Sequence, residues 1–84
     1  MKDVKIYTTD YCGYCLSAKH LLEAQEIQFT ELDVTNDFEK RKWLAQTTGQ
    51  RTVPQIFIGD RPIGGYAEIS ELIRTKKLRE LLED

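Results

Sequence analysis

Two cysteines separated by two residues, Cys12 and Cys15, have the clearest chemical potential in this sequence. They lie where a pattern of alternating β-forming residues gives way to a pattern typical of a helix. A thiol in the first turn of a helix faces unpaired backbone N–H groups and the positive end of the helix dipole, and both favour thiolate over thiol. Because thiolate is the reactive form of cysteine, this placement predicts redox chemistry.

The two sulfurs are expected to have different roles. One helical turn brings the second sulfur near the first, so the pair suits a reaction in which one thiol attacks and the other resolves. Cys12 is the outer sulfur and is predicted to be the nucleophile. Cys15 begins the apolar face of the helix, so we expect it to be partly buried and to act as the resolving thiol.

Two other interpretations of the dithiol are weaker. A tetrahedral zinc site would need two further ligands, and the chain has no other cysteine and only one histidine, His20. His20 lies mid-helix, where we expect a solvent-facing side chain with no catalytic role. An inert disulfide would not explain why the pair stands at a helix start. A close pair beside a strand-helix-strand pattern is typical of thioredoxin-like redox proteins.

The segment Thr52-Val53-Pro54 is a second candidate for a functional role. A proline at the head of a strand lacks an N–H for the ladder, which is tolerated at an edge or where the backbone stays open. If the bond before Pro54 is cis and lies beside Cys12, Val53 can offer its N–H and C=O to an extended thiol peptide. The alternative is a plain proline at a strand start, and on these residues alone both stay open.

Gly64 and Gly65 precede the last predicted helix. Taken alone, they are best explained as an ordinary turn. The alternative is a close approach of the backbone to a ligand, with the N-terminus of the following helix receiving a carboxylate.

The elements that must position these residues follow from periodicity. Strands are predicted where apolar and polar residues alternate, and helices where apolar residues recur every three or four positions. The predicted strands cover residues 4–9, 27–34, 53–58 and 61–63, and the predicted helices cover residues 14–25, 37–47, 67–75 and 77–82. This order predicts an α/β fold with a four-stranded mixed sheet flanked by helices on both faces. The dithiol then follows the first strand, where ligands of open sheets gather.

Local signals refine the ends of the helices. Asn36 or Asp37 can cap the second helix, and Gly49 is a stop signal beyond its end. The C-terminal helix is expected to break near Lys76.

Apolar side chains are assigned to the core unless they flank the dithiol. Leu16 is placed on the apolar face of the first helix. The larger residues assigned to the core rather than to a stacking surface are Phe29, Phe38, Trp43 and Phe57. Tyr11 and Tyr14 differ, because they flank the reactive sulfurs and can line a groove.

Length and composition exclude several classes of protein. Eighty-four residues predict a single domain, residues 1–84, because so short a chain has no surface to spare for a second core. A net charge of −2 gives no electrostatic case for nucleic-acid binding. No window approaches the roughly 20 apolar residues of a membrane span, and the N-terminal residues lack an apolar h-region, so we expect a cytoplasmic protein. Two cysteines in a reducing compartment indicate reversible redox work or metal binding.

With these motifs in view, the chain resembles the glutaredoxins over its whole length. Glutaredoxins carry a C-x-x-C pair at a helix start, a T-G-x-x-T-V-P segment matched here by residues 48–54, and a G-G turn before the last helix. The order and spacing of these motifs within 84 residues make the resemblance specific. It implies a thioredoxin fold, a cis Pro54, and glutathione as the bound thiol.

The resemblance also implies a set of glutathione-binding residues. Tyr14 would line the glutathione groove, and Val53 would pair with the cysteinyl backbone of the ligand. Tyr66 and Ala67 would meet its γ-glutamyl carboxylate through the start of the last helix, and Arg41 would point toward its glycine carboxylate. The complete expected set is Tyr14, Arg41, Thr52, Val53, Pro54, Gly65, Tyr66 and Ala67.

The sequence departs from the usual glutaredoxin pattern in three places. Thr9 stands where a lysine is usual, which removes one carboxylate contact and one charge that stabilises the thiolate. Ala67 and Glu68 stand where aspartates are frequent, at the expected position of the glutathione amine. Gly13 replaces the more usual proline inside the dithiol motif.

The function that the resemblance implies is a glutathione-dependent thiol-disulfide oxidoreductase. Cys12 thiolate would attack the glutathione sulfur of a mixed disulfide, and Cys15 would resolve a mixed disulfide with a protein. The expected partners are glutathione and disulfide-containing or glutathionylated proteins, with no nucleic acid and no membrane. The apo protein is expected to be a monomer without a metal ion.

Two alternatives stay open. In the first, two chains each use Cys12 and a glutathione thiolate to hold one [2Fe-2S] cluster in a dimer that acts as a carrier or sensor. Gly13 motivates this alternative, because similar glycine-containing active sites occur among cluster-binding glutaredoxins. In the second, a flavin-dependent reductase rather than glutathione reduces the dithiol. Arg41 and the segment Thr52-Val53-Pro54 favour glutathione.

Overall fold

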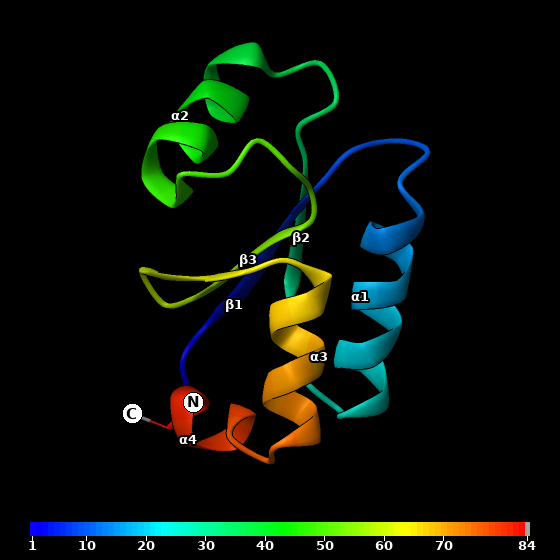
Figure 1. Cartoon of the computed structure of the whole chain (residues 1–84), viewed down its shortest axis with the longest axis vertical. Coiled ribbons are helices and arrows are strands. Elements are labelled where there is room, and N and C mark those ends of the chain that lie inside the picture. The colour runs from blue at the N-terminus through cyan, green and yellow to red at the C-terminus, as the bar shows by residue number, and fades with distance from the viewer. Residues whose placement is uncertain (84) are drawn as a thin grey trace.

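The computed structural model describes residues 1–83, and its elements follow the predicted order (Figure 1). The strands are β1 (Val4–Thr8), β2 (Thr30–Asp33), β3 (Gln55–Ile58) and β4 (Arg61–Gly64). The helices are α1 (Gly13–Ala24), α2 (Phe38–Thr48), α3 (Tyr66–Arg74) and α4 (Leu78–Leu82). Within residues 1–83, no helix is long and apolar enough to cross a membrane.

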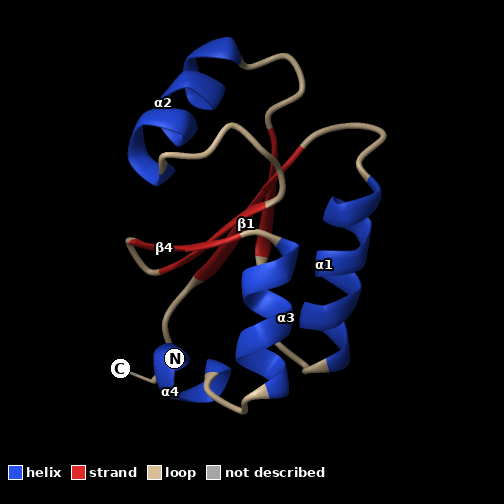
Figure 2. Cartoon of the chain, viewed as in Figure 1, coloured by secondary structure: helices blue, strands red, loops and turns tan. Residues whose placement is uncertain are grey.

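The strands form one mixed sheet in the order β2-β1-β3-β4 (Figure 2). β1 and β2 are parallel, so the chain must cross over between them, and α1 makes that connection. β3 pairs antiparallel with both β1 and β4, and a tight turn at Gly59 joins β3 to β4. The predicted four-stranded mixed sheet is confirmed.

One face of the sheet packs against α1 and α3, which lie side by side in Figure 1. Ile6 of β1 and Ile56 of β3 are register partners, and both are fully buried at this face. Leu22 of α1 and Ile69 of α3 close over them. The buried members of this core cluster are Val4, Ile6, Ala18, Leu22, Ile27, Ile56, Ile58, Ile69, Leu78 and Leu82.

The opposite face packs against α2. Tyr7 follows Ile6 along β1 and therefore points the other way, where it joins Leu44 of α2 and Phe57 of β3 in a second buried cluster. The rings of Tyr7 and Phe57 meet edge to face at 5.5 Å between centroids. Because successive residues of β1 are both buried, helices must cover both faces of the sheet, as predicted.

The helix ends carry the capping residues that the sequence indicated. Asp37, rather than Asn36, caps α2 by accepting a hydrogen bond from the Lys40 backbone N–H at 3.0 Å. Gly49 ends the helix with a φ of 74°, the left-handed region that glycine adopts at little cost. The break between α3 and α4 falls at Lys76, with a φ of 61°.

Two strands begin later than predicted. The strand predicted over residues 27–34 begins only at Thr30, because the backbone N–H of Ile27 bonds to the carbonyl of Leu22 and so completes the end of α1. The strand predicted to begin at Val53 begins at Gln55, after a proline that has no N–H to give to the ladder.

Three apolar assignments were wrong, those of Phe38, Leu16 and Trp43. Phe38, assigned to the core, is 80% exposed, and Leu16, placed on the apolar face of the first helix, is 52% exposed. Each lies six residues before the leucine that anchors its helix, Leu44 in α2 and Leu22 in α1. At 3.6 residues per turn, a spacing of six turns a side chain about 120° away from that anchor. Trp43 is also 39% exposed, although its ring stacks on Phe57.

We expect Leu22→Ala to lower the free energy of unfolding by about 2–5 kcal/mol, because it opens a cavity between α1 and the sheet. Leu16→Ala on the same helix is the matched control and should change it by less than about 0.5 kcal/mol. Urea denaturation of both variants measures the difference. Equal losses would place Leu16 in the core after all.

Candidate active site

Cys12 and Cys15 stand at the N-terminus of α1, as predicted. Cys12 is the N-cap residue, and its Sγ accepts a hydrogen bond from the Cys15 backbone N–H at 3.1 Å. Cys12 is half-buried, whereas Cys15 is only 2% exposed. Both are free thiols in this structure. The outer sulfur is therefore the one that a substrate can reach first.

The surroundings of Cys15 favour the protonated thiol. Burial, followed by the hydrogen bond with the Cys12 side chain, raises the pKa of Cys15 to about 12. At neutral pH the Cys15 side chain is accordingly a neutral thiol. Its position in the core and its protonation state both fit a group that acts after Cys12.

The turn before β3 lies directly beside Cys12. The Val53–Pro54 peptide bond is cis, as the resemblance implied. The thiol of Cys12 donates to the Val53 carbonyl oxygen over 3.7 Å, so sulfur and turn are in contact. Of the two interpretations left open for Pro54, the one with a cis bond beside the dithiol is confirmed.

A buried amide that the sequence analysis missed holds this turn in place. Gln55 is 1% exposed, and its Nε2 donates to Gln50 Oε1 at 3.0 Å and to the Thr52 carbonyl at 2.9 Å. The signal in the sequence was a lone amide at the head of an otherwise apolar strand. The side chain that anchors the turn therefore belongs to the sheet itself.

A groove with a volume of about 600 Å³ runs from the dithiol helix to α3. Tyr14 of α1 forms one wall, and its ring lies 5.7 Å from that of Tyr66 on α3. The floor is the turn before β3. Of the expected glutathione-binding residues, those that line this groove are Tyr14, Thr52, Val53, Pro54, Gly65, Tyr66 and Ala67.

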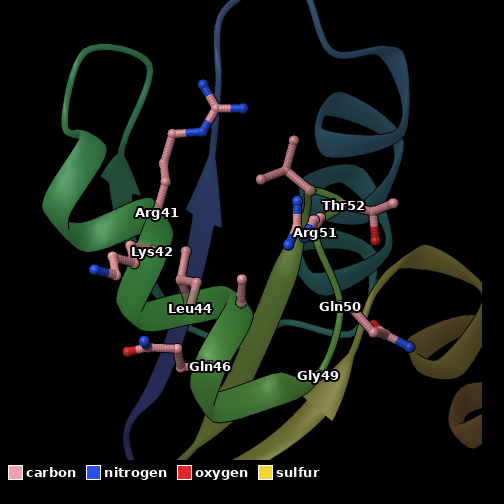
Figure 3. Close-up of a pocket in the computed structure, with 10 residues that line it drawn as sticks. Arg41, Lys42, Leu44, Gln46, Gly49, Gln50, Arg51 and Thr52 are labelled. Carbon is pink, nitrogen blue, oxygen red and sulfur yellow. The ribbon is translucent and has the colours of Figure 1, made fainter.

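Arg41 lies in an adjoining cavity of about 630 Å³ that shares Gln50, Thr52 and Val53 with the groove. Figure 3 shows α2 carrying Arg41 on one side of this cavity and the loop carrying Arg51 on the other. Both arginines are exposed, and neither forms an ion pair within residues 1–83. The cavity therefore offers unpaired positive charge suited to a carboxylate.

The double glycine is explained by crowding. A Cβ on Gly65 would lie 3.0 Å from the Pro54 carbonyl oxygen, and a Cβ on Gly64 would lie 2.5 Å from Glu68 Oε1. Gly64 also has a φ of 120°. Glu68, which the sequence analysis left without a role, accepts the Gly65 backbone N–H at 2.7 Å and caps α3. The glycines let the start of α3 approach the turn.

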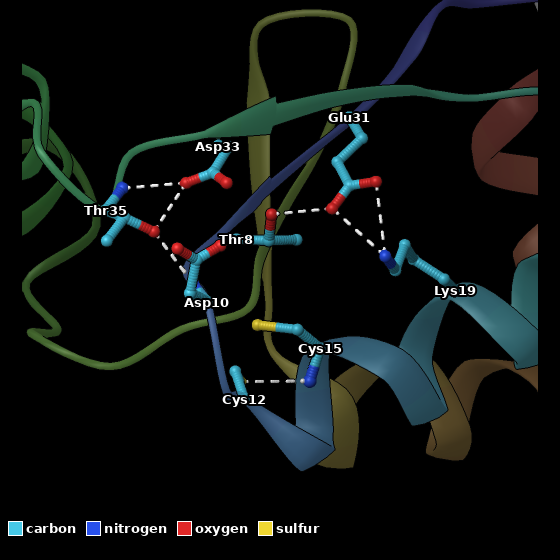
Figure 4. A network of polar contacts seen from close by, with 8 residues as sticks. All are labelled: Thr8, Asp10, Cys12, Cys15, Lys19, Glu31, Asp33 and Thr35. Carbon is cyan, nitrogen blue, oxygen red and sulfur yellow. Dashed lines mark hydrogen bonds and ion pairs between the residues drawn. The ribbon is translucent and has the colours of Figure 1, made fainter.

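A polar network lies on the other side of the dithiol (Figure 4). Thr8 Oγ1 of β1 donates to Glu31 Oε2 of β2 at 2.8 Å, and Lys19 Nζ of α1 donates to both oxygens of Glu31 at 3.1 and 3.2 Å. The Thr8 hydroxyl, followed by the Lys19 ammonium, holds the pKa of Glu31 below its usual value. The sequence analysis missed this network, because it depends on the pairing of β1 with β2.

His20 is exposed on α1, as expected. Tyr11, predicted to line a groove with Tyr14, is fully exposed and lines the cavity on the Lys19 side of the dithiol rather than the groove that Tyr14 lines.

Comparison with known proteins gives a consistent result. The glutaredoxin family model matches residues 4–63. A glutaredoxin of Pseudomonas aeruginosa is 43% identical over 82 residues, which are 98% of this chain and 98% of that protein.

Solved structures agree with this match. The solution structure of a glutaredoxin from Brucella melitensis has a TM-score of 0.88 and 40% identity, over 98% of this chain and 89% of that one. A crystal structure of a buckwheat glutaredoxin-glutathione complex has a TM-score of 0.87 and 33% identity, over 96% and 76% of the two chains. The chain therefore has the thioredoxin fold and belongs to the glutaredoxin family.

Proposed function

We propose that this glutaredoxin reduces protein disulfides and glutathione mixed disulfides with glutathione as the electron donor. The observation that carries the proposal is the position of Cys12 Sγ, which caps α1 and touches the Val53 carbonyl at the edge of the groove. A ligand thiol that pairs with Val53 would therefore approach this sulfur. The buckwheat relative solved with glutathione supports the choice of ligand.

The monothiol reaction needs Cys12 alone. Cys12 thiolate attacks the glutathione sulfur of a mixed disulfide, the disulfide bond breaks, and the substrate leaves as a thiolate that takes up a proton. This leaves a disulfide between Cys12 and glutathione. The thiolate of a second glutathione attacks the bound glutathione sulfur, releases oxidised glutathione and restores Cys12 thiolate.

The dithiol reaction adds Cys15. When Cys12 has attacked a protein disulfide, Cys15 loses its proton and its sulfur attacks Cys12 Sγ. The partner leaves as a thiol, and a disulfide between Cys12 and Cys15 remains. Two glutathione molecules then reduce that disulfide and become oxidised glutathione.

The groove suits an extended peptide with two carboxylates. Val53 presents backbone N–H and C=O groups beside Cys12, which suits pairing with the cysteinyl residue of glutathione. Glu68 already takes the Gly65 N–H, so the N–H groups of Tyr66 and Ala67 at the start of α3 are left for the γ-glutamyl carboxylate. Arg41 then serves the glycine carboxylate from the adjoining cavity. Thr52, Pro54 and Gly65 shape the floor of the groove.

A flavin-dependent reductase is the competing electron donor. Arg41, which has no ion-pair partner among residues 1–83, and the backbone of the turn favour glutathione, since both offer contacts that a small peptide can use. Incubation of the oxidised dithiol with each reductant separately distinguishes them. Recovery of free thiols in the flavoprotein sample but not in the glutathione sample would exclude the glutathione-dependent cycle.

A [2Fe-2S] cluster shared by two chains is a second candidate. The observation in its favour is the open space beside the dithiol, where a Cβ on Gly13 would meet nothing within 4 Å. Within residues 1–83, no group of three or more Cys, His, Asp or Glu side chains could hold a metal ion. Cys12 of each chain together with two glutathione thiolates would therefore hold the cluster, which would supply electron transfer or be passed to another protein.

The division of labour between the sulfurs gives a direct test. We expect Cys12→Ser to abolish turnover of a glutathione mixed disulfide, because serine offers no sulfur to form the intermediate. Cys15→Ser should keep much of this activity, since the monothiol reaction does not use Cys15. Glutathione-coupled consumption of NADPH measures both variants. Equal loss in the two variants would contradict the assignment of Cys12 as the nucleophile.

The role of Arg41 gives a second test. Arg41→Gln is expected to raise the KM for glutathione roughly threefold to tenfold, because one charge-assisted hydrogen bond to the glycine carboxylate is lost. Lys40→Gln is the matched control, since it removes the same charge one position earlier from a side chain that lies over the Trp43 ring, 4.8 Å from its centroid. An equal rise of the KM in both variants would show that the loss of any positive charge on α2 has this effect, and would contradict a specific contact of Arg41 with the carboxylate.

Gly13 gives a test of the cluster. Gly13 is the first residue of α1 and has open space around it, so Gly13→Pro should fit and raise the free energy of unfolding by about 0.4–1 kcal/mol. If the cluster role is correct, the wild-type protein gains visible absorbance on anaerobic reconstitution with iron, sulfide and glutathione, and Gly13→Pro reduces it. A colourless wild-type protein would exclude the cluster.

A further inference from the structure

Cys15 shares one face of α1 with a lysine. Cys15 and Lys19 are four residues apart, which places them one above the other on the helix. Figure 4 shows both side chains projecting from α1 toward the strands that carry Thr8 and Glu31. Both residues also line a cavity of about 410 Å³ on the opposite side of the dithiol from the groove.

The lysine pairs with a carboxylate of β2 that a hydroxyl of β1 also contacts. Its Nζ lies 3.1 Å from Glu31 Oε2, and that same oxygen accepts the hydroxyl of Thr8, which is 2% exposed. The side chains of Lys19 and Glu31 are 26% and 39% exposed, so the ion pair adds little to stability. The ion pair matters more for the charge that the ammonium of Lys19 brings near a neighbouring ionisable side chain.

That neighbouring group is Cys15. The dithiol reaction requires its thiolate, yet burial strongly disfavours a negative charge on this sulfur. After burial, the Cys12 side chain also raises the pKa of Cys15, whereas a hydrogen bond from the Thr9 backbone and, as the smallest influence, the charge of Lys19 lower it. Lys19 is the one cation among the residues that line the cavity, and the acidic side chains that line it are Asp10, Glu31 and Asp33.

We propose that Lys19 is a positioning residue for the resolving step, and that Glu31 sets the strength of its effect. The ammonium of Lys19 stabilises the negative charge on Cys15 Sγ as its proton passes to water in the cavity. The sulfur then attacks Cys12 Sγ of the mixed disulfide, the Cys12–Cys15 bond forms, and the departing partner thiolate takes up a proton. This inference rests on the proposed dithiol reaction.

The test exploits the opposite charges of the pair. Lys19→Gln removes the cation, whereas Glu31→Gln removes the carboxylate that neutralises it, and both break the same ion pair. If Lys19 acts by its charge, Lys19→Gln lowers the thiolate fraction of Cys15 and Glu31→Gln raises it. A merely structural role would move both variants in the same direction.

The first measurement does not depend on enzymatic activity. In a Cys12→Ser protein, whose serine can still cap α1, the rate of Cys15 alkylation by iodoacetamide at mildly alkaline pH reports the thiolate fraction. We expect Lys19→Gln to slow alkylation roughly threefold to tenfold, Glu31→Gln to speed it by a similar factor, and Lys19→Arg to restore the wild-type rate. Arg74→Gln, which breaks an ion pair on α3, is the control and should leave the rate unchanged.

The second measurement is reduction of a protein disulfide by the dithiol enzyme. Lys19→Gln should slow it and shift the pH at which the rate rises to a higher value, and this effect should disappear when Cys15 is replaced by Ser. Slower alkylation in both the Lys19 and Glu31 variants, or no change in either, would overturn the inference. Opposite shifts in alkylation with no glutathione-dependent turnover of the wild-type protein would instead overturn the proposed function and leave the role of Lys19 standing.

Discussion

The hydrogen bond from the Cys15 backbone N–H to Cys12 Sγ is the interaction on which the rest of the site depends. Within its first turn α1 has no acidic residue, so the sulfur is the side chain that caps the helix. The same bond places the two sulfurs one turn apart and sets which of them faces the surface and which faces the core.

The surroundings of the dithiol differ on its two sides. Toward α2 and α3, Cys12 meets the turn before β3 and a groove flanked by Arg41 and Arg51, which form no ion pair with any described residue. Toward β2, the cavity beside Cys15 holds acidic side chains and a single lysine. The groove and the acidic cavity therefore lie on opposite sides of the N-terminus of α1, which follows the end of the central strand β1.

The features that the sequence predicts well are those with local causes. The capping of α2 by Asp37, its end at Gly49 and the dithiol at a helix start all depend on neighbouring residues. The exposure of Phe38 and Leu16 depends on how each helix is rotated against the sheet, which spacing alone left undetermined. The contact of Thr8 with Glu31 arises from the register of β1 with β2, in which Thr8 lies opposite Asp33. Pairing between distant strands sets that register, so no single segment encodes it.

The groove owes its rigidity to contacts made outside it. Gln55 ties the turn to β3, the close approach of Gly65 to the Pro54 carbonyl fits α3 against that turn, and Tyr14 is carried by a helix whose own anchor is in the core. Contacts within the protein itself therefore hold the walls of the groove in position. A short flexible peptide such as glutathione loses conformational freedom on binding, so a preformed groove keeps the total entropic cost low. Gln55 and Gly65 accordingly shape the groove by holding its walls in place, although Gln55 does not line it.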